Sequence, residues 1–316
     1  MSKINMTFSE KIELLSCELG YKVKGRLRLQ PKNSDKYASR IVVDAQSGAT
    51  LLVEELNSDK PFLVGRFGMN ECTAATKYLR KVAIGGTYGA ALKLMCTNAG
   101  FFPENEEYLD RYAEMVLPLY NQLDMLCVMR ALGEEFIIKH YCPNATLTTL
   151  RAIEPAVTQW TSVLKDKKVL VIHPFEESIR NQYFNNREKI YLGTDILPEF
   201  NLQTVKAVQT AADNPDERFA SWFDALDYMT EEALKKDFDI ALIGCGAYGL
   251  PLGARIKQEG KKAVHMGGCL QLLFGIRGAR WDTRDYMKPF INEFWTRPSQ
   301  SEIPEEAKKV ENACYW

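Results

Sequence analysis

The chain has 316 residues, of which 40 are lysine or arginine and 41 are aspartate or glutamate, giving a formal charge of −1. This length allows one large α/β domain or two modest lobes with a substantial hydrophobic core. Hydrophobic residues at 46% and charged residues at 26% exclude a disordered or collagen-like chain. The balanced charge argues against a protein built mainly to bind nucleic acid.

The cysteines and the first residues indicate the compartment. The eight cysteines are scattered without a C-x-x-C pair, so we expect reduced thiols and neither a zinc site nor a thioredoxin-like motif. The polar start of the chain does not resemble a secretion signal. The uncharged stretch 240–254 is too short to span a bilayer. We therefore expect a cytoplasmic protein without a transmembrane segment, with peripheral attachment to a membrane left open.

The first half of the chain predicts an α/β layer. Its expected elements are an amphipathic segment over 8–19, a basic strand over 21–29, a helix over 47–56, a buried strand over 61–67, helices from about 68 to 82 and from about 104 to 123, and a strand over 125–129.

The second half alternates more clearly between apolar strands and amphipathic helices. Strands are expected over 169–173, 202–208, 238–243 and 262–266, with helices beginning at 176 and covering 216–236 and 250–260. This spacing predicts a Rossmann-like, doubly wound and mostly parallel sheet flanked by helices. We divide the chain into an N-terminal α/β lobe, residues 1–155, and a Rossmann-like nucleotide-binding lobe, residues 156–316, which together form one compact unit.

A glycine-rich loop is the first candidate for ligand binding. The segment Gly244-Cys-Gly-Ala-Tyr-Gly249 matches G-x-G-x-x-G between a predicted strand and a predicted helix. Glycines there let the backbone approach a diphosphate, whose charge is favoured by a helix N-terminus. The next strand ends without an acidic residue for a ribose diol, which argues against NAD. The pattern predicts a phosphate-binding loop, the alternative being close helix–sheet packing, and its candidate residues are Gly244, Gly246, Tyr248 and Gly249.

A second candidate lies where the strand over 61–67 ends, in the segment Gly65-Arg-Phe-Gly-Met-Asn-Glu71. Arg66 can pair with a phosphate or a carboxylate through two parallel hydrogen bonds. Glu71, near a helix start, is a candidate general base or metal ligand, and a helix-capping role is the alternative.

Two further candidates follow later strands. His173 ends a strand and can hydrogen-bond a phosphate or a ribose, or serve only the structure. Gly267 and Gly268 open a helix, and Arg277 and Arg280 behind them either neutralise a leaving diphosphate or lie on a solvated face. The patterns of serine hydrolases, P-loop nucleotidases and zinc proteases do not occur in the sequence.

Together these segments resemble a bacterial group of polysaccharide-locus proteins related to the GT-D-fold glycosyltransferases. The likeness is carried by residues 64–71, 168–175, 240–253 with 265–268, and 310–316, and it leaves residues 1–45 uncovered. It implies a Rossmann-like transferase that moves a sugar from a nucleotide-sugar donor to a glycan or lipid-linked acceptor during cell-surface polysaccharide synthesis.

The resemblance also bears on metal use. Such enzymes carry an Arg-Phe-Gly-Asp-Gly-Glu type signature whose Asp-x-Glu holds a divalent metal. The residues that match are Arg66, Phe67, Gly68 and Glu71. Met69 replaces the aspartate, and Asn70 replaces the glycine. Either Glu71 holds Mn²⁺ or Mg²⁺ together with the donor diphosphate, or the enzyme is metal-independent. We favour the second, because methionine is a poor ligand for these hard cations.

The sequence thus predicts a glycosyltransferase of the hexosyltransferase type, in which Glu71 is the base. Arg66, Arg277 or the helix start at Gly244–Gly249 stabilises the departing diphosphate, with Arg66 taken as the catalytic residue. The alternatives are a non-catalytic nucleotide-binding module, suggested by Met69, and an NAD(P)-dependent oxidoreductase, suggested by the glycine loop alone. The apolar residues 314–316 are expected to fold back onto the domain or onto a subunit partner, which leaves a homo-oligomer open.

Overall fold

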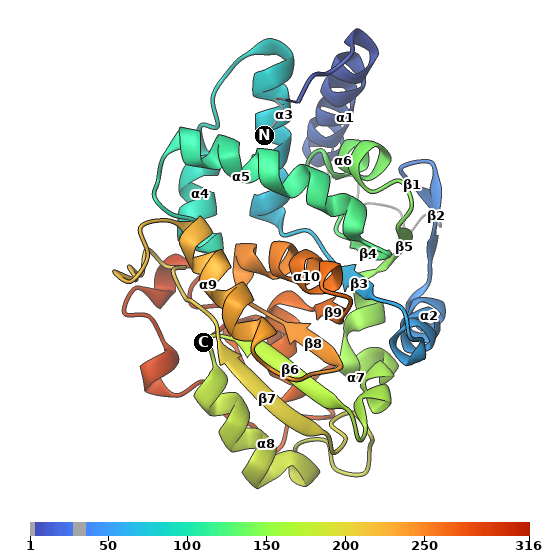
Figure 1. The fold of residues 1–316 in the computed structure, drawn as a ribbon, viewed down its shortest axis with the longest axis vertical. Helices are drawn as coiled ribbons and strands as arrows, with labels where there is room; N and C mark the ends of the chain where they lie inside the picture. The colour runs from blue at the N-terminus through green and yellow to red at the C-terminus, as the bar shows by residue number, and fades with distance from the viewer. Residues whose placement is uncertain (1–3, 28–35) are drawn as a thin grey trace.

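The computed structural model describes residues 4–27 and 36–316, and it contains one nine-stranded sheet (Figure 1). The strands are β1 (Lys36–Tyr37), β2 (Arg40–Val43), β3 (Phe62–Gly65), β4 (Met125–Val128), β5 (Thr146–Thr149), β6 (Lys168–His173), β7 (Asn201–Lys206), β8 (Ile240–Ile243) and β9 (Lys262–His265). Their order in the sheet is β1-β2-β5-β4-β3-β9-β8-β6-β7. All neighbouring pairs are parallel except β1 and β2.

Helices connect most of these strands. They are α1 (Phe8–Arg26), α2 (Ala45–Asn57), α3 (Met69–Ile84), α4 (Ala90–Ala99), α5 (Glu106–Leu119), α6 (Glu134–Tyr141), α7 (Pro155–Thr158), α8 (Glu176–Ile190), α9 (Trp222–Leu234), α10 (Gly249–Gln258), α11 (Leu270–Leu273) and α12 (Ala279–Asp282). No helix in the described residues is long and apolar enough to cross a membrane.

Both faces of the sheet are covered. Leu63 of β3 belongs to a core with residues of α3, α5, α9 and α10, whereas its neighbours Phe62 and Val64 belong to a second core with residues of α2 and α8. Side chains alternate between the two faces of a strand, so an apolar run without alternation indicates a strand buried on both sides. This architecture confirms the predicted Rossmann-like class, with a mostly parallel sheet between layers of helices.

The two halves of the chain meet inside the sheet. β3 from the first half pairs directly with β9 from the second, with Val64 opposite Val264. The sheet therefore runs without interruption across the predicted division after residue 155, and that division stays a prediction.

Two predicted elements are wrong in part. Residues 21–26 continue α1 rather than forming a strand, and residues 28 and 29 lie outside the described residues. A capping box between Thr7 and Glu10 starts this helix, and its regular turns then continue through the basic segment. The second element is the helix predicted over 216–236, which begins at Trp222 instead of Asp216. Ser221 caps it, and Asp216 forms a local turn with Arg218.

Candidate functional site

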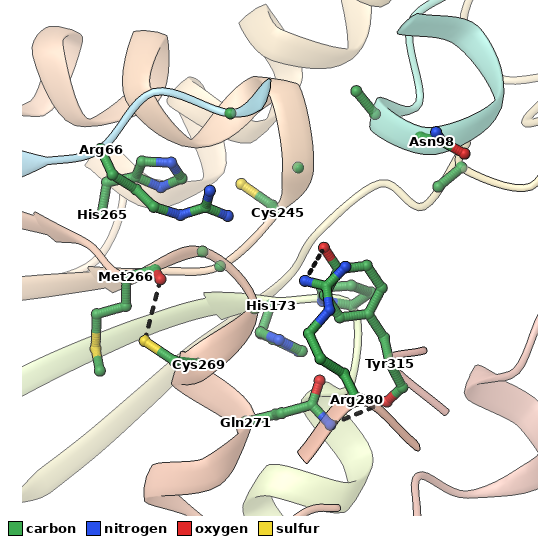
Figure 2. Close-up of a pocket in the computed structure, with 18 of the residues that line it drawn as sticks. Arg66, Asn98, His173, Cys245, His265, Met266, Cys269, Gln271, Arg280 and Tyr315 are labelled. Atoms are coloured by element: carbon green, nitrogen blue, oxygen red, sulfur yellow. Dashed lines mark hydrogen bonds between the residues drawn. The ribbon is translucent and has the colours of Figure 1, made fainter. Parts of the chain in front are cut away.

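The four central strands β3, β9, β8 and β6 are adjacent and parallel, so their carboxyl ends lie along one edge of the sheet. A cavity of about 610 Å³ opens there, lined by residues that follow each of the four strands (Figure 2). β7 and β8 lie on opposite sides of β6, which makes this edge a topological switch point. Doubly wound sheets bind their ligands in the crevice at such a point.

Arg66 is the cationic centre of the cavity. It follows β3, is half-buried, and packs its guanidinium over the Cα of Gly267. Its Nη1 donates to the carbonyl of Phe67 at 3.3 Å and approaches Met129 Sδ at 3.9 Å. No carboxylate of the described residues lies within 4.0 Å of this guanidinium, although most other arginines of the chain have one. The charge of Arg66 is therefore available to an anionic ligand.

His173 presents a neutral donor to the same cavity. The ring is buried, and its Nδ1 accepts a hydrogen bond from the backbone N–H of Phe175 at 3.0 Å. Burial lowers the pKa of His173 to about 3, so the ring is neutral at physiological pH. Because Nδ1 accepts, the single ring proton is on Nε2. His173 lines the cavity and can donate that proton in a hydrogen bond to a ligand oxygen.

His265, at the end of β9, lies beside Arg66 in Figure 2. Burial, and to a lesser extent the charge of Arg66, lowers its pKa to about 3. Its ring packs against Gly249, where an added methyl group would lie 2.2 Å from the ring. Its Nδ1 is buried and has no hydrogen-bond partner in the described residues. His265 belongs to a segment that carries the sequence resemblance, but no motif in the sequence predicts a role for it.

The glycine loop brings backbone groups to the cavity. Gly244, Cys245 and Gly246 line it, and a single 3-10 turn, Gly246–Tyr248, leads directly into α10. The first N–H groups of a helix have no partner within it and carry partial positive charge. A methyl group on Gly244 would lie 2.7 Å from the carbonyl oxygen of Gly267, so the ends of β8 and β9 are in close contact.

The other two candidate residues of the loop, Tyr248 and Gly249, serve packing, although Tyr248 also lines the cavity. Tyr248 is buried, stacks on Trp222 with ring centroids 5.0 Å apart, and its hydroxyl lies 3.1 Å from Thr210 Oγ1. Of the two roles considered for Tyr248, stacking on a ligand and packing in the core, this geometry favours packing. Gly249 does not line the cavity, and its missing side chain makes room for His265.

Glu71 lies at the edge of the cavity in the first turn of α3, together with Gly68 and Asn70. Its carboxyl group folds back onto Gly68, where a methyl group would lie 1.7 Å from Oε2. Burial raises the pKa of Glu71, and the positive charge of Arg66 opposes this effect. The carboxyl group therefore holds a proton more readily than an exposed glutamate does.

The residues around Glu71 do not fit a metal ion held by the protein. Met69 is 43% exposed and offers only a thioether at the position of the expected aspartate. The described residues contain no group of three or more histidine, cysteine, aspartate or glutamate side chains positioned to bind a metal.

The two arginines near the C-terminus have different positions. Arg280 lines the cavity, where its Nη1 donates to the hydroxyl of Tyr315 at 3.0 Å and its Nη2 pairs with Glu311 at 2.6 Å. Arg277 is not among the lining residues. It donates from Nε and Nη2 to Asp282, both at 3.0 Å, which holds its charge outside the cavity.

Residues 314–316 fold back onto the domain, one of the two expected outcomes, and Tyr315 and Trp316 form one wall of the cavity. The carbonyl of Trp316 accepts hydrogen bonds from Ala279 and Arg297, and Tyr315 packs against Gly268. Beside them the Nε2 of Gln271 donates to the carbonyls of Ile276 and Tyr315.

These contacts leave two buried polar atoms without a partner. They are Gln271 Oε1 and Trp316 Nε1, and both residues line the cavity. With His265 Nδ1, three of the six such atoms in the described residues belong to residues that line this cavity. Buried polar groups are usually satisfied, so this concentration is typical of a site that binds a polar ligand.

Sequence reasoning missed several lining residues. Glu154, whose pKa is raised by burial, lies after β5 and is paired with Arg151 at 3.0 Å. Asn98, Arg284 and Tyr286 also line the cavity. Glu154 follows a strand with no motif, Asn98 lies near the end of α4, and Arg284 and Tyr286 belong to a loop, so no local pattern identifies them.

Comparisons with known proteins add little to this geometry. No protein-family model and no curated protein matches the chain. Among solved structures, it is similar to one described as "Selenomethionine substituted structure of domain of unknown function 1792 (DUF1792)". The two share 11% identity with a TM-score of 0.41, over 72% of this chain and 78% of that chain. A similarity this low carries no inference about function.

Proposed function

We propose that the chain is a glycosyltransferase that binds a nucleotide-sugar in the cavity at the carboxyl ends of β3, β9, β8 and β6. The observation that carries this proposal is Arg66, an arginine in the cavity with no carboxylate partner in the described residues, next to the N-terminal turn that leads into α10. The donor of a sugar transfer leaves behind a nucleoside diphosphate. Fixed positive groups at that position favour its departure.

The other lining groups support the same ligand. His173 Nε2–H and the backbone N–H groups after Cys245 are neutral donors suited to phosphate oxygens. Gln271 Oε1 and Trp316 Nε1 are an acceptor and a donor suited to hydroxyl groups. The cavity of about 610 Å³ lies within the range of small-molecule sites. The acceptor class, a glycan or lipid-linked glycan, rests on the sequence resemblance alone.

We assign the role of general base to Glu71, because it lies in the cavity and burial raises its pKa. In this proposal the transfer needs no metal held by the protein. Arg66 and the helix N-terminus supply the positive charge that a divalent ion supplies in other enzymes.

The test is thermal-shift binding of UDP, GDP, CMP, dTDP and NAD⁺, each with and without Mn²⁺, followed by turnover of the matching nucleotide-sugars. A ligand at about 100 times its Kd stabilises the folded chain by about 2.7 kcal/mol, which gives a clear rise in melting temperature. We expect one nucleoside diphosphate to bind without Mn²⁺ and its sugar conjugate to be turned over.

Each other outcome points to a different protein. Nucleotide binding with no transfer and no donor hydrolysis would identify a non-catalytic nucleotide-binding module, which Met69 at the expected aspartate position also favours. Binding of NAD⁺ alone would overturn the proposal in favour of an oxidoreductase. Binding that requires Mn²⁺ would contradict the metal-independent mechanism.

A further inference from the structure

Helix α1 contributes no residue to the lining of the cavity, and it carries an exposed apolar stripe. Phe8, Ile12, Leu19 and Val23 are 80%, 50%, 64% and 45% exposed, and Leu27 just after the helix is 63% exposed. Their spacings of four and seven residues place them on one side of the helix. In Figure 1, α1 lies at the outer margin of the molecule next to α3. A single exposed apolar side chain is ordinary, but a continuous stripe marks an interaction surface.

The acidic side chains of α1 are engaged locally or by the domain. Glu18 is buried and pairs with Arg80 of α3 at 2.6 Å. Glu13 contacts Lys139 and His140 of α6, both at 3.0 Å. Glu10 closes the capping box with Thr7. The negative charges of α1 are therefore neutralised or directed away from the exposed stripe.

The basic side chains of α1 have no such partners among the described residues. No carboxylate of the residues that the structure describes lies within 4.0 Å of Lys11, Lys22, Lys24 or Arg26. At 100° per residue, Lys11 and Lys22 border one side of the stripe, Arg26 lies in line with it, and Lys24 lies beyond the other side. The outward surface of α1 is thus apolar along its middle and positively charged at its borders and in its last turns.

We propose that α1 lies flat on an anionic lipid bilayer, with the apolar stripe at the level of the headgroups and upper acyl chains. An apolar face bordered by lysines and arginines is the pattern of interfacial helices, which gain both from apolar burial and from attraction to anionic lipids. A second copy of the chain is a poorer occupant. In a two-fold symmetric contact the same surface meets itself, so each copy would add basic side chains while the carboxylates of both α1 helices are already engaged.

This inference does not depend on the proposed function and is tested without a nucleotide. The full chain is sedimented with vesicles of phosphatidylcholine alone and of phosphatidylcholine mixed with phosphatidylglycerol. We expect binding to the anionic vesicles only, falling as salt screens the charges. Binding to both kinds of vesicle alike, or to neither, would overturn the proposal.

Two double variants separate the charge from the apolar stripe. Lys22→Gln with Lys24→Gln and Phe8→Ser with Leu19→Ser both change exposed side chains, so the fold is expected to survive. Each pair should weaken vesicle binding by roughly tenfold or more. The matched controls are Lys206→Gln with Lys308→Gln and Ile84→Ser with Leu94→Ser, which are exposed elsewhere and should leave binding unchanged.

Two results would refute the assignment to α1. One is equal loss of vesicle binding in the α1 variants and in their controls. The other is a dimer in solution that Phe8→Ser with Leu19→Ser dissociates, without vesicle binding by the wild type, which would assign the stripe to a second copy.

Discussion

The guanidinium of Arg66 lies directly over the Cα of Gly267. A methyl group added to Gly267 would lie 2.6 Å from Nη2 and 2.8 Å from Nε of Arg66. The two residues follow neighbouring strands, β3 and β9, so the parallel pairing of these strands brings them into contact. Gly267 also has φ of +61°, a backbone conformation that side chains disfavour. The position of the arginine thus depends on a glycine some 200 residues away in sequence.

Substituting Gly267 should therefore displace Arg66. Gly267→Ala is expected to weaken nucleoside diphosphate binding, because the new methyl group and the guanidinium compete for one space. The matched control is Gly260→Ala, where φ is +78° and no atom lies within 4 Å of the added methyl group. Both variants should lose about 1 kcal/mol of stability from backbone strain. Calorimetric titration would decide: equal Kd values for the two variants would mean that the contact does not position the arginine for binding.

Arg66 itself should dominate the affinity for the diphosphate. Hydrogen bonds to charged groups contribute about 1.5–3 kcal/mol, so Arg66→Ala should raise the Kd by roughly 10- to 150-fold. Arg66→Lys keeps the charge but loses the forked geometry of the guanidinium. Its Kd should therefore lie between those of the wild type and of Arg66→Ala. The control is Arg277→Lys, since Arg277 is held by Asp282 outside the cavity. A larger loss at Arg277 than at Arg66 would reverse our assignment of the two residues.

The two buried histidines predict how stability depends on pH. Burial lowers the pKa of both His173 and His265 from 6.5 to about 3, so the unfolded chain takes up protons on these residues before the folded chain does. Their stabilising effect is complete above pH 6.5 and is lost as the pH falls towards 3. Within that window the free energy of unfolding should fall by about 1.4 kcal/mol per ring for each unit by which the pH is lowered.

The variant His265→Gln isolates one of these rings. Urea unfolding between about pH 7 and about pH 4.5 gives the free energy of unfolding as a function of pH. In the variant the slope of this free energy against pH should correspond to roughly one proton fewer than in the wild type. The comparison uses slopes, so a uniform loss of stability in the variant does not affect it. If the two slopes coincided, the ring of His265 would not be a neutral buried group.

Glu71 should affect turnover and not donor binding. Glu71→Gln keeps the shape of the side chain and removes its ability to accept a proton, so we expect turnover to fall by roughly 100-fold or more. The thermal shift caused by the nucleoside diphosphate should remain. Glu107→Gln, an exposed substitution in the first turn of α5, serves as the control. Unchanged turnover in a folded Glu71→Gln protein would remove this residue from the mechanism.

The sequence predicted the central strands because their signal is local. β3, β6, β8 and β9 are short apolar runs ended by glycine, proline or histidine, and these four strands carry the candidate site. The basic segment 21–26 was wrongly predicted to be a strand. Its residues are exposed in the helix, and none is held in place by the core. A pattern without burial does not distinguish a strand from the end of a helix.

The roles that the sequence left open for its candidate residues depend on distant contacts. Arg277 and Arg280 are three residues apart, and what separates them is the partner of each: Asp282 holds the first, and Glu311 with Tyr315 holds the second. In the same way, the place of Tyr248 is set by Trp222 of α9. Such contacts arise only once the chain has folded, so local spacing does not reveal them.

The last three residues should stabilise the domain as well as close the cavity. Trp316 is 9% exposed, its carbonyl accepts two hydrogen bonds, and the carbonyl of Tyr315 accepts one from Gln271. Truncating a buried tryptophan costs about 3–5 kcal/mol. For a chain of this size each kcal/mol shifts the melting temperature by about 2–4 °C. Deleting residues 314–316 should therefore lower the melting temperature by on the order of 10 °C.

The control for this deletion is Trp316→Phe. The indole Nε1 has no partner in the described residues, so phenylalanine loses no hydrogen bond there and keeps most of the aromatic contact. Differential scanning calorimetry should show a small shift for Trp316→Phe and a large one for the deletion. If the protein lacking residues 314–316 had the same melting temperature as the wild type, this segment would not pack on the domain in solution. The wall that it forms in the cavity would then be absent too.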